Sequence, residues 1–341
     1  MQGLQPSQDS FAVSVIATVL NEANEIDRLV ASLATQTLVP AEVIIVDGGS
    51  NDGTWERLEA AKTKYPNLTP IRDETCRLEH SPGPIARGRN VAIKAATGGI
   101  IACADAGCAY NSDWLENLTA AIRSGQTQYA VGGSCIDPDH RTVWDVAAAP
   151  FLGVKLSANA KTKSCTARSM AFTKELWQRV GGFPENLFFG EDTIFDQKAR
   201  AIIAPAFVDR AKAFYHPHHT FSSAVRQLAS YAVSDGVSGA RPARLARNLI
   251  RCVVEVIALL LLIWTPIPLL CVLAFETYFA YRLDWRDLGG ASARMLAARL
   301  LFSLVVPWVV TLNHFKGSIT KSNLPNRQNL DLKPDSQPSR Q

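Results

Sequence analysis

The first fifty residues alternate between strand and helix patterns, and this alternation restricts the fold more than any other feature. Residues 11–20 (FAVSVIATVL) and 42–46 (EVIIV) are nearly continuous apolar runs, as in strands buried on both faces of a parallel sheet. Between them, apolar residues recur at helical spacing, at Ile26, Leu29, Val30 and Leu33. A strand, a helix and a second strand in succession imply parallel strands with right-handed crossovers. We therefore expect an α/β domain with helices flanking a mainly parallel sheet.

Later segments continue the same pattern as far as about residue 245. We expect strands at 100–104, 129–134, 164–172 and 206–215, and helices at 55–65, 85–96, 174–180 and 191–201. These expectations divide the chain into four parts. They are a disordered N-terminus (1–10), a catalytic domain (11–245), apolar helices (246–318) and a disordered polar tail (319–341).

Composition and charge exclude some classes of protein. Charged residues make up 19% of the chain, below the roughly 25% of an ordinary soluble protein. The net charge of +4 gives no argument for nucleic-acid binding, and we expect none. Residues 1–10 lack the basic start and apolar run of a signal peptide, so we expect the catalytic domain to stay in the cytosol. The seven cysteines have irregular spacing and include no Cys-x-x-Cys pair, so we expect them to be reduced thiols.

An apolar stretch at residues 252–281 contains no Lys or Arg. One membrane span needs about 20 apolar residues, so this stretch is long for one span and short for two. Pro266 and Pro268 in its middle permit either a kinked span or a hairpin that enters and leaves on one side. A second stretch without Lys or Arg covers residues 300–315.

Arginines on both sides of the first stretch favour the hairpin. Positive residues concentrate on the cytosolic side of membranes, and a single span would separate the two clusters. The clusters are Arg241, Arg244, Arg247 and Arg251 before the stretch, and Arg282, Arg286, Arg294 and Arg299 after it. The alternative is a pair of core helices in a soluble protein. Because a carboxylate is costly in lipid, we expect Glu255 and Glu276 to lie near the interface or to pair with arginine.

Acidic residues follow the first two strands directly. Glu22 comes after the first strand and Asp47 after the second, and the carboxyl ends of strands are where open parallel sheets bind ligands. Carboxylates there can accept hydrogen bonds from a nucleobase or a ribose. The glycine-rich segment 47–54 (DGGSNDGT) is not a dinucleotide fingerprint, because Ser50 stands where Gly-x-Gly-x-x-Gly requires glycine. Taken alone, the segment is equally consistent with a simple turn.

Three further segments carry polar residues of the kinds that bind ligands or catalyse reactions. The segment 87–90 (RGRN) precedes the short strand that ends at Asp105, which by itself is also typical of a strand cap. Segments 181–184 (GGFP) and 190–193 (GEDT) lead into a helix that begins with Glu191 and Asp192; acidic residues also favour helix starts for electrostatic reasons alone. Residues 214–220 (FYHPHHT) contain a histidine cluster, which can bind metal or be a surface loop.

Together and in this order, these segments resemble family 2 glycosyltransferases, which have the GT-A fold, a Rossmann-like, mainly parallel sheet flanked by helices. The resemblance covers about residues 11–245 and the layout of the apolar tail. It implies that the donor nucleotide and its diphosphate contact a group of acidic and basic residues, namely Glu22, Asp47, Asp52, Arg87, Arg89 and Asp105. Arginine suits phosphate because its planar fork donates two hydrogen bonds.

The resemblance also implies a metal and a base. Asp105 corresponds to the first aspartate of the family's Asp-x-Asp, which binds a divalent cation, Mn²⁺ or Mg²⁺; Gly107 stands at the second position, so one carboxylate is absent. His216 is a candidate to complete the metal site. Asp192, with Glu191 beside it, corresponds to the family's general base, and a base that activates the acceptor hydroxyl predicts inversion at the anomeric carbon.

The resulting hypothesis is a membrane-attached glycosyltransferase. It moves one sugar from a UDP- or GDP-sugar to a lipid-linked or saccharide acceptor of the cell envelope, at the cytoplasmic face of the inner or plasma membrane. Single-sugar transfer is expected because the Gln-x-x-Arg-Trp motif of processive synthases is absent. One alternative is a non-catalytic membrane protein that retains the fold. Gly107, at the position of the second aspartate, favours this alternative. A nucleotidyltransferase is less favoured, because no Gly-rich, Lys-containing phosphate loop opens the chain.

Overall fold

A computed structural model describes residues 11–139, 141–157, 161–162, 165–217, 219–282 and 292–323. The strands are β1 (Val13–Val19), β2 (Glu42–Asp47), β3 (Leu68–Arg72), β4 (Ile100–Cys103), β5 (Cys108–Tyr110), β6 (Tyr129–Ile136), β7 (Met170–Thr173) and β8 (Ala206–Tyr215). They form one sheet in the order β3-β2-β1-β4-β7-β6-β8-β5. The half β3-β2-β1-β4 is parallel, as expected, whereas β7 is antiparallel to both β4 and β6.

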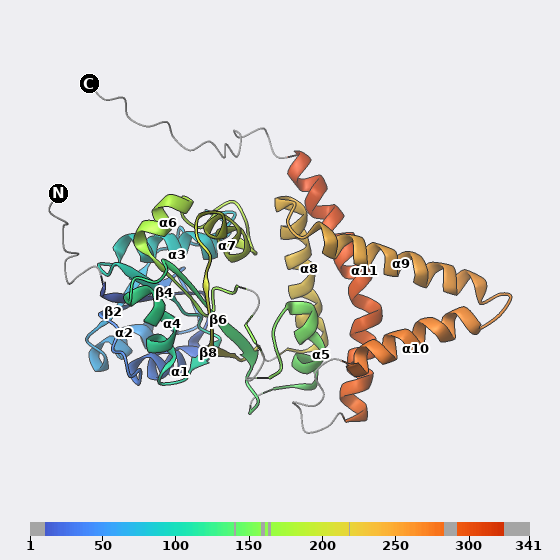
Figure 1. The fold of residues 1–341 in the computed structure, drawn as a ribbon, viewed down its shortest axis with the longest axis horizontal. Coiled ribbons are helices and arrows are strands. Elements are labelled where there is room, and N and C mark those ends of the chain that lie inside the picture. Colours follow the sequence, from blue (N-terminus) through green and yellow to red (C-terminus); the bar gives the residue numbers. More distant parts are fainter. Residues whose placement is uncertain are drawn as a thin grey trace.

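Helices cover the sheet and then continue beyond it (Figure 1). Those of the sheet domain are α1 (Ala23–Ala34), α2 (Thr54–Lys64), α3 (Pro84–Ala95), α4 (Trp114–Arg123), α6 (Lys174–Val180) and α7 (Glu191–Ile202). Those on the other side of the molecule are α5 (Val143–Leu152), α8 (Phe221–Ser238), α9 (Pro242–Leu261), α10 (Ile267–Arg282) and α11 (Ala293–Asn323). The expected boundary at 245/246 falls inside α9, and that at 318/319 falls inside α11. The expected disordered N-terminus 1–10 and most of the expected disordered tail 319–341 lie outside the described residues, but residues 319–323 of that tail are helical, as the end of α11.

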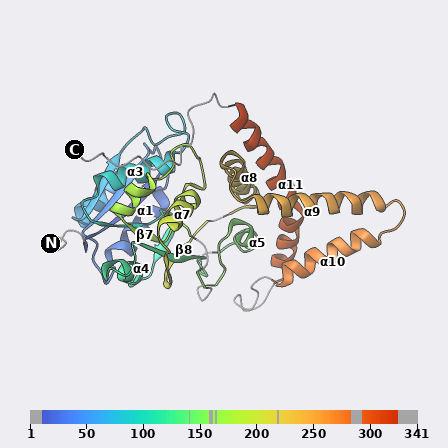
Figure 2. The ribbon, with the colours of Figure 1, turned by 45° about the horizontal axis from the view of Figure 1, so that its top comes forward.

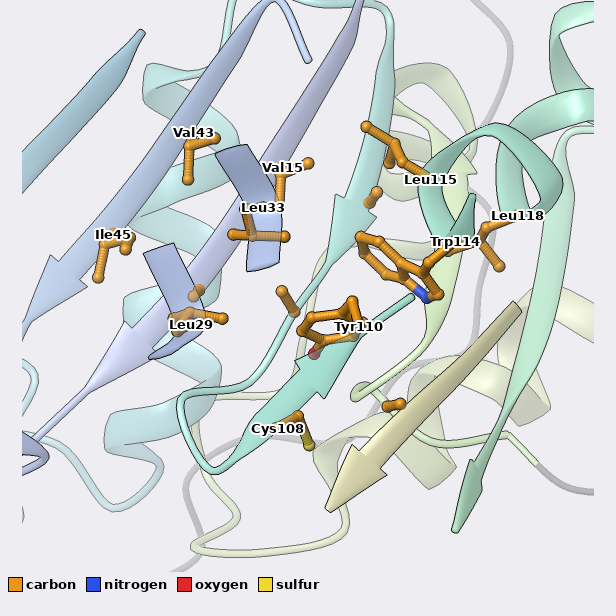
Figure 3. Close-up of a cluster of buried hydrophobic side chains, with 14 of the residues drawn as sticks. Val15, Leu29, Leu33, Val43, Ile45, Cys108, Tyr110, Trp114, Leu115 and Leu118 are labelled. Atoms are coloured by element: carbon orange, nitrogen blue, oxygen red, sulfur yellow. The ribbon is translucent and has the colours of Figure 1, made fainter. Parts of the chain in front are cut away.

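Alternate side chains of the central strands enter two separate hydrophobic layers. Val15, Val43 and Ile45 pack with α1 and α4 on one face, as Figure 3 shows, and Trp114 of α4 is fully buried there. Ile16 and Ile44 point to the opposite layer, which contains residues of α3, α6 and α7. Burial on both faces explains why these strands are continuous apolar runs rather than alternating ones.

The C-terminal helices pack at close range through two glycines. A Cβ atom at Gly236 of α8 would lie 2.1 Å from the His314 carbonyl oxygen of α11. A Cβ at Gly317 of α11 would lie 2.1 Å from the Val233 carbonyl oxygen of α8. Backbone contact of this kind requires glycine at both positions, so α8 and α11 form a closely packed pair.

Helices α9 and α10 form a hairpin that projects from the rest of the molecule (Figures 1 and 2). Its base is held by Arg251, whose guanidinium lies 2.6 Å from Glu276 of α10 and donates to the Ser303 carbonyl of α11. This confirms the expected pairing of Glu276 with arginine. Glu255 instead accepts a hydrogen bond of 2.6 Å from the Trp308 indole. Both carboxylates therefore have a partner within the helical unit, although the Glu255 Oε1 atom is buried with no hydrogen-bond partner among the described residues.

Within the described residues, one helical segment is long and apolar enough to cross a membrane, Ala293–Thr320 in α11. Of its apolar window, 44% is buried against the chain itself, so a core helix of a soluble protein would pass the same criterion. The expected stretch 300–315 lies within this segment. The stretch 252–281 is divided between α9 and α10. Neither meets the criterion, because α9 contains too many charged residues and α10 is too short.

Candidate functional site

A cavity of about 1060 Å³ lies between the sheet domain and the C-terminal helices. Its walls come from the carboxyl ends of β1 and β4, the start of α7, the end of β8, and helices α8 and α9. Its volume is at the upper end of the range for small-molecule sites, which leaves room for two substrates. Six of the residues predicted for the site line it, namely Glu22, Arg89, Asp105, Glu191, Asp192 and His216.

Glu22 and Asp105 repel each other across the sheet edge. Burial raises the pKa of Glu22 to about 7, and the neighbouring charge of Asp105 adds to that shift, with smaller contributions from Glu25 and Asp52. Because β1 pairs with β4 in parallel register, both residues follow strands that end at the same edge. The structure therefore brings together two carboxylates that a cation would stabilise.

Asp105 is held in place by its own turn and by Arg168. Its backbone N–H donates to the Tyr110 hydroxyl at 2.8 Å, and that hydroxyl donates to the Arg168 carbonyl at 3.0 Å. The Arg168 guanidinium lies 3.5 Å from the Asp105 carboxylate and 4.1 Å from the centre of the Tyr215 ring. A fixed positive charge thus stands beside the carboxylate at the end of β4.

Glu191 and Asp192 begin α7 but have different surroundings. Glu191 is 5% exposed and forms an ion pair with Arg89, a residue that is itself buried. Asp192 is only partly buried and accepts hydrogen bonds from the backbone N–H groups of Ala167 at 3.2 Å and Thr193 at 2.6 Å. Of the two carboxylates, Asp192 is therefore the one that a substrate can reach.

Three predicted donor residues do not line the cavity. Asp47 is fully buried and accepts hydrogen bonds from Ser50, although the neighbouring Gly48 does line the cavity. Asp52 accepts hydrogen bonds from backbone N–H groups at the starts of α1 and α2. Arg87 points to Glu185, 3.2 Å away. Their contact with a donor stays a prediction.

His216 lies close to the Asp105 turn, because its backbone N–H donates to the Gly107 carbonyl at 2.8 Å. Its buried imidazole pairs with Asp137, and burial lowers the pKa of that imidazole, with Arg28 adding to the effect. Among the residues that the structure describes, no three His, Cys, Asp or Glu side chains are arranged to hold a metal ion. His218 lies outside the described residues.

The part of the chain that forms this sheet edge is similar to known proteins. Residues 14–176 match the family described as Glycosyl transferase family 2. Residues 14–176, just under half of the chain, thus resemble glycosyltransferase family 2. Over 197 residues the chain is 31% identical to Glycosyltransferase AglE of Haloferax volcanii, covering 55% of this chain and 60% of AglE. Over 124 residues it is 32% identical to the human Probable polypeptide N-acetylgalactosaminyltransferase 8, covering 34% of this chain and 19% of that protein. The chain thus spans about three fifths of AglE and about one fifth of the human protein.

A solved structure confirms the expected GT-A fold. The mannosyltransferase PcManGT from Pyrobaculum calidifontis, in complex with GDP-Man and Mn²⁺, superposes with a TM-score of 0.53. The alignment covers 88% of this chain and 86% of that one at 19% identity, so the likeness concerns the fold alone.

The cavity also contains residues that the sequence does not point to. Arg168 reaches Asp105 from the loop before β7, and Gln227 and Tyr231 of α8 also line the cavity. The sequence pattern places Arg244 and Arg247 of α9 only in a cytosolic charge cluster, but both line the cavity. The signal that the sequence contained was their spacing, which places them on one helical face beside the site.

Proposed function

We propose that the chain is a membrane-attached glycosyltransferase that moves one sugar from a nucleotide-sugar donor to a lipid-linked or saccharide acceptor, with inversion. One observation carries the proposal. Glu22, Asp105 and Asp192 come from three distant parts of the sequence and line the same cavity, which has room for two substrates. Donor and acceptor must meet in such a space, with a base on the acceptor side.

On the donor side, Glu22 lies at the sheet edge where nucleotides bind in open parallel sheets. Arg89 adds a positive charge to the cavity wall, although one of its guanidinium nitrogens already pairs with Glu191. For Asp47, Asp52 and Arg87, a direct contact with the donor requires that the 47–54 turn or the Arg87 side chain rearrange, because each is engaged elsewhere.

A divalent cation, Mn²⁺ or Mg²⁺, would bind Asp105 together with diphosphate oxygens of the donor. The crowding of Glu22 and Asp105 is the feature of this chain that fits a cation. Hard oxygen ligands suit these ions, and the bound cation would neutralise charge on the departing diphosphate. His216 stays a candidate ligand by its closeness to Gly107. Arg168 supplies a second positive charge at the same carboxylate.

On the acceptor side, Asp192 would accept the proton of the attacking hydroxyl. Two backbone N–H groups orient its carboxylate towards the cavity from the first turn of α7. The oxygen attacks the anomeric carbon, the bond to the diphosphate breaks, and the configuration inverts because no protein nucleophile takes part. Glu191 and Arg89 act as a buried pair that positions this turn.

Membrane attachment would use the α9–α10 hairpin. From Arg251 to Leu261, α9 rises about 15 Å at 1.5 Å per residue, half of a bilayer core of about 30 Å. The tip residues Ile263 and Trp264 are 84% and 86% exposed. A hairpin of this length enters one leaflet and keeps the catalytic domain on the cytosolic side of the inner or plasma membrane.

The test is transfer of a radiolabelled sugar by membranes that contain the protein, with a series of UDP- and GDP-sugars and with EDTA as a control for the cation. We expect loss of transfer in Asp105→Ala and Asp192→Asn, and unchanged transfer in Asp113→Asn, an exposed aspartate outside the cavity. Unchanged transfer in both cavity variants would reject the proposed roles.

A second candidate is a non-catalytic membrane protein that retains the family fold. The observation in its favour is the pairing of Asp105 with Arg168, together with Gly107 in place of a second aspartate. Calorimetric titration with nucleotide sugars, with and without Mn²⁺, separates the two, since a protein without donor binding under any condition cannot be the enzyme.

A further inference from the structure

The wall of the cavity opposite the sheet edge carries arginines that the donor chemistry does not use. Arg241 immediately precedes α9, and three more follow within its first ten residues, namely Arg244, Arg247 and Arg251. They recur every three or four residues and all line the cavity, so they share one side of the helix. We call these four residues the α9 arginine face.

The α9 arginine face has an excess of positive charge. Asp235 is shared by Arg241 at 3.5 Å and Arg244 at 3.0 Å, and Glu276 pairs with Arg251. Arg247 is exposed and forms no ion pair within the described part of the chain. Two guanidinium groups thus share the Asp235 carboxylate, and Arg247 pairs with no carboxylate among the described residues, so the face offers positive charge to an anion.

Backbone conformation ties this face to the catalytic side of the cavity. Arg241 adopts the left-handed conformation with φ 55° and ψ 49°, which is uncommon for a residue with a side chain. Its guanidinium donates a hydrogen bond of 2.6 Å to the Thr193 hydroxyl, next to Asp192. Such conformations persist where surrounding contacts hold them, often at ligand sites. An anion on the arginine face would therefore lie near the proposed base.

Beyond Arg251 the surface of α9 becomes apolar. Exposed hydrophobic residues cover the rest of the helix and the start of α10, including Val253, Val254, Ile257, Leu260, Ile263 and Trp264. A cationic cavity wall is thus continuous with an apolar surface along a single helix. The ligand that matches both is an amphiphile with an anionic head and a hydrocarbon chain.

We propose that the α9 arginine face binds the phosphate of an acceptor built as a phosphate ester of a long hydrocarbon chain, whose chain lies along the apolar hairpin. Arginine forks match phosphate oxygens and hold the head group in the cavity, so that the hydroxyl of a sugar carried by that phosphate would face Asp192. The inference rests on the proposed function and specifies its acceptor.

The test measures binding of dodecyl phosphate to the full chain in a neutral detergent by calorimetry, with inorganic phosphate and dodecyl maltoside as comparison ligands. Loss of one charge-assisted contact weakens binding roughly tenfold. We expect a loss of that order for dodecyl phosphate in Arg247→Gln and a larger loss in Arg244→Gln with Arg247→Gln. Arg226→Gln on α8 is the matched control, because Arg226 is exposed and outside the cavity.

Each outcome bears on the inference. Equal affinity of the wild type and Arg247→Gln for dodecyl phosphate overturns it, and so does equal binding of dodecyl maltoside. Inorganic phosphate that binds as tightly as dodecyl phosphate rejects the role of the hydrocarbon chain. Binding of UDP- and GDP-sugars is measured on the same samples. One result separates the two proposals. If the wild type binds dodecyl phosphate but no nucleotide sugar, and Arg247→Gln binds dodecyl phosphate more weakly, the glycosyltransferase proposal fails while the anion site stands.

Discussion

Asp192 is the residue on which the proposed chemistry depends most. Replacement by asparagine keeps the shape and the contacts with Ala167 and Thr193 but removes the proton acceptor. General base catalysis contributes about 10²–10⁴ in rate, so we expect kcat for sugar transfer to fall by that factor with little change in donor binding. Steady-state transfer and donor titration on the same preparation measure both quantities. A variant with full kcat would assign the base to another group.

Glu22 predicts an unusual dependence of stability on pH. Its pKa is raised from 4.5 to about 7, so between these values the folded protein holds a proton that the unfolded chain has released. Stability must therefore fall as the pH rises from about 4.5 to about 7. Because the side chain is only partly buried, we expect the loss to be about 1–2 kcal/mol, less than the full linkage.

Glu22→Gln removes this titration, so its free energy of unfolding should exceed that of the wild type at pH 8 and approach it at pH 4.5. Chemical denaturation at several pH values in neutral detergent measures the difference. Glu59→Gln, at an exposed position of α2, should keep the wild-type slope. The same slope in Glu22→Gln and wild type would show that Glu22 ionises normally.

Single residues at strand ends were accessible from the sequence, but their partners were not. Glu22 and Asp105 could be placed at one sheet edge because parallel strands end together. The pairing of Arg89 with Glu191 joins residues 102 positions apart, and no local pattern encodes it. Arg89 was expected to face a diphosphate, whereas much of its charge is already balanced by a carboxylate of the same cavity.

Helix pairing offers a prediction at the scale of elements. Gly317→Ala would gain up to about 1 kcal/mol from helix propensity, since alanine is the better helix former. The new Cβ would, however, lie 2.1 Å from the Val233 carbonyl oxygen, a backbone atom that moves only if α8 moves. Overpacking costs about 1–3 kcal/mol, so the clash prevails and the thermal midpoint should fall. Lys316→Ala, the exposed neighbour, should leave the midpoint nearly unchanged; equal midpoints for both variants would contradict the close packing.

Elements with strong local signals were predicted, and those that depend on the rest of the chain were not. The runs that became β1, β2 and β4 are apolar on both faces, and this pattern is visible in any window. β3 carries Pro70 at the sheet edge, and β5 has three residues that are stabilised by pairing with β8. Neither resembles a strand by itself. α4, in contrast, has a clear helical pattern of buried residues, so its local sequence is sufficient to predict it.

At the scale of the whole molecule, the cavity belongs to neither half of the chain alone. The sheet domain contributes the carboxylates and the C-terminal helices contribute the arginines, with Arg241 and Thr193 in direct contact between them. The expected division at residue 245 falls between Arg244 and Arg247, two residues of the same cavity wall. Isolation of residues 11–245 would therefore remove part of the site.

The hairpin gives the last prediction. Replacement of Ile263 and Trp264 by aspartate puts two charges at the tip, where both side chains are more than four-fifths exposed, so the fold should be unaffected. Burial of each apolar side chain is worth about 1.5–3 kcal/mol, so the partition of the protein onto vesicles should fall by at least a hundredfold. Flotation with anionic vesicles measures it, and Val39→Asp, at a 74% exposed position of the sheet domain, is the matched control. Unchanged flotation of the double variant would mean that α11 or another surface holds the membrane, and the hairpin would lose its proposed place in the leaflet.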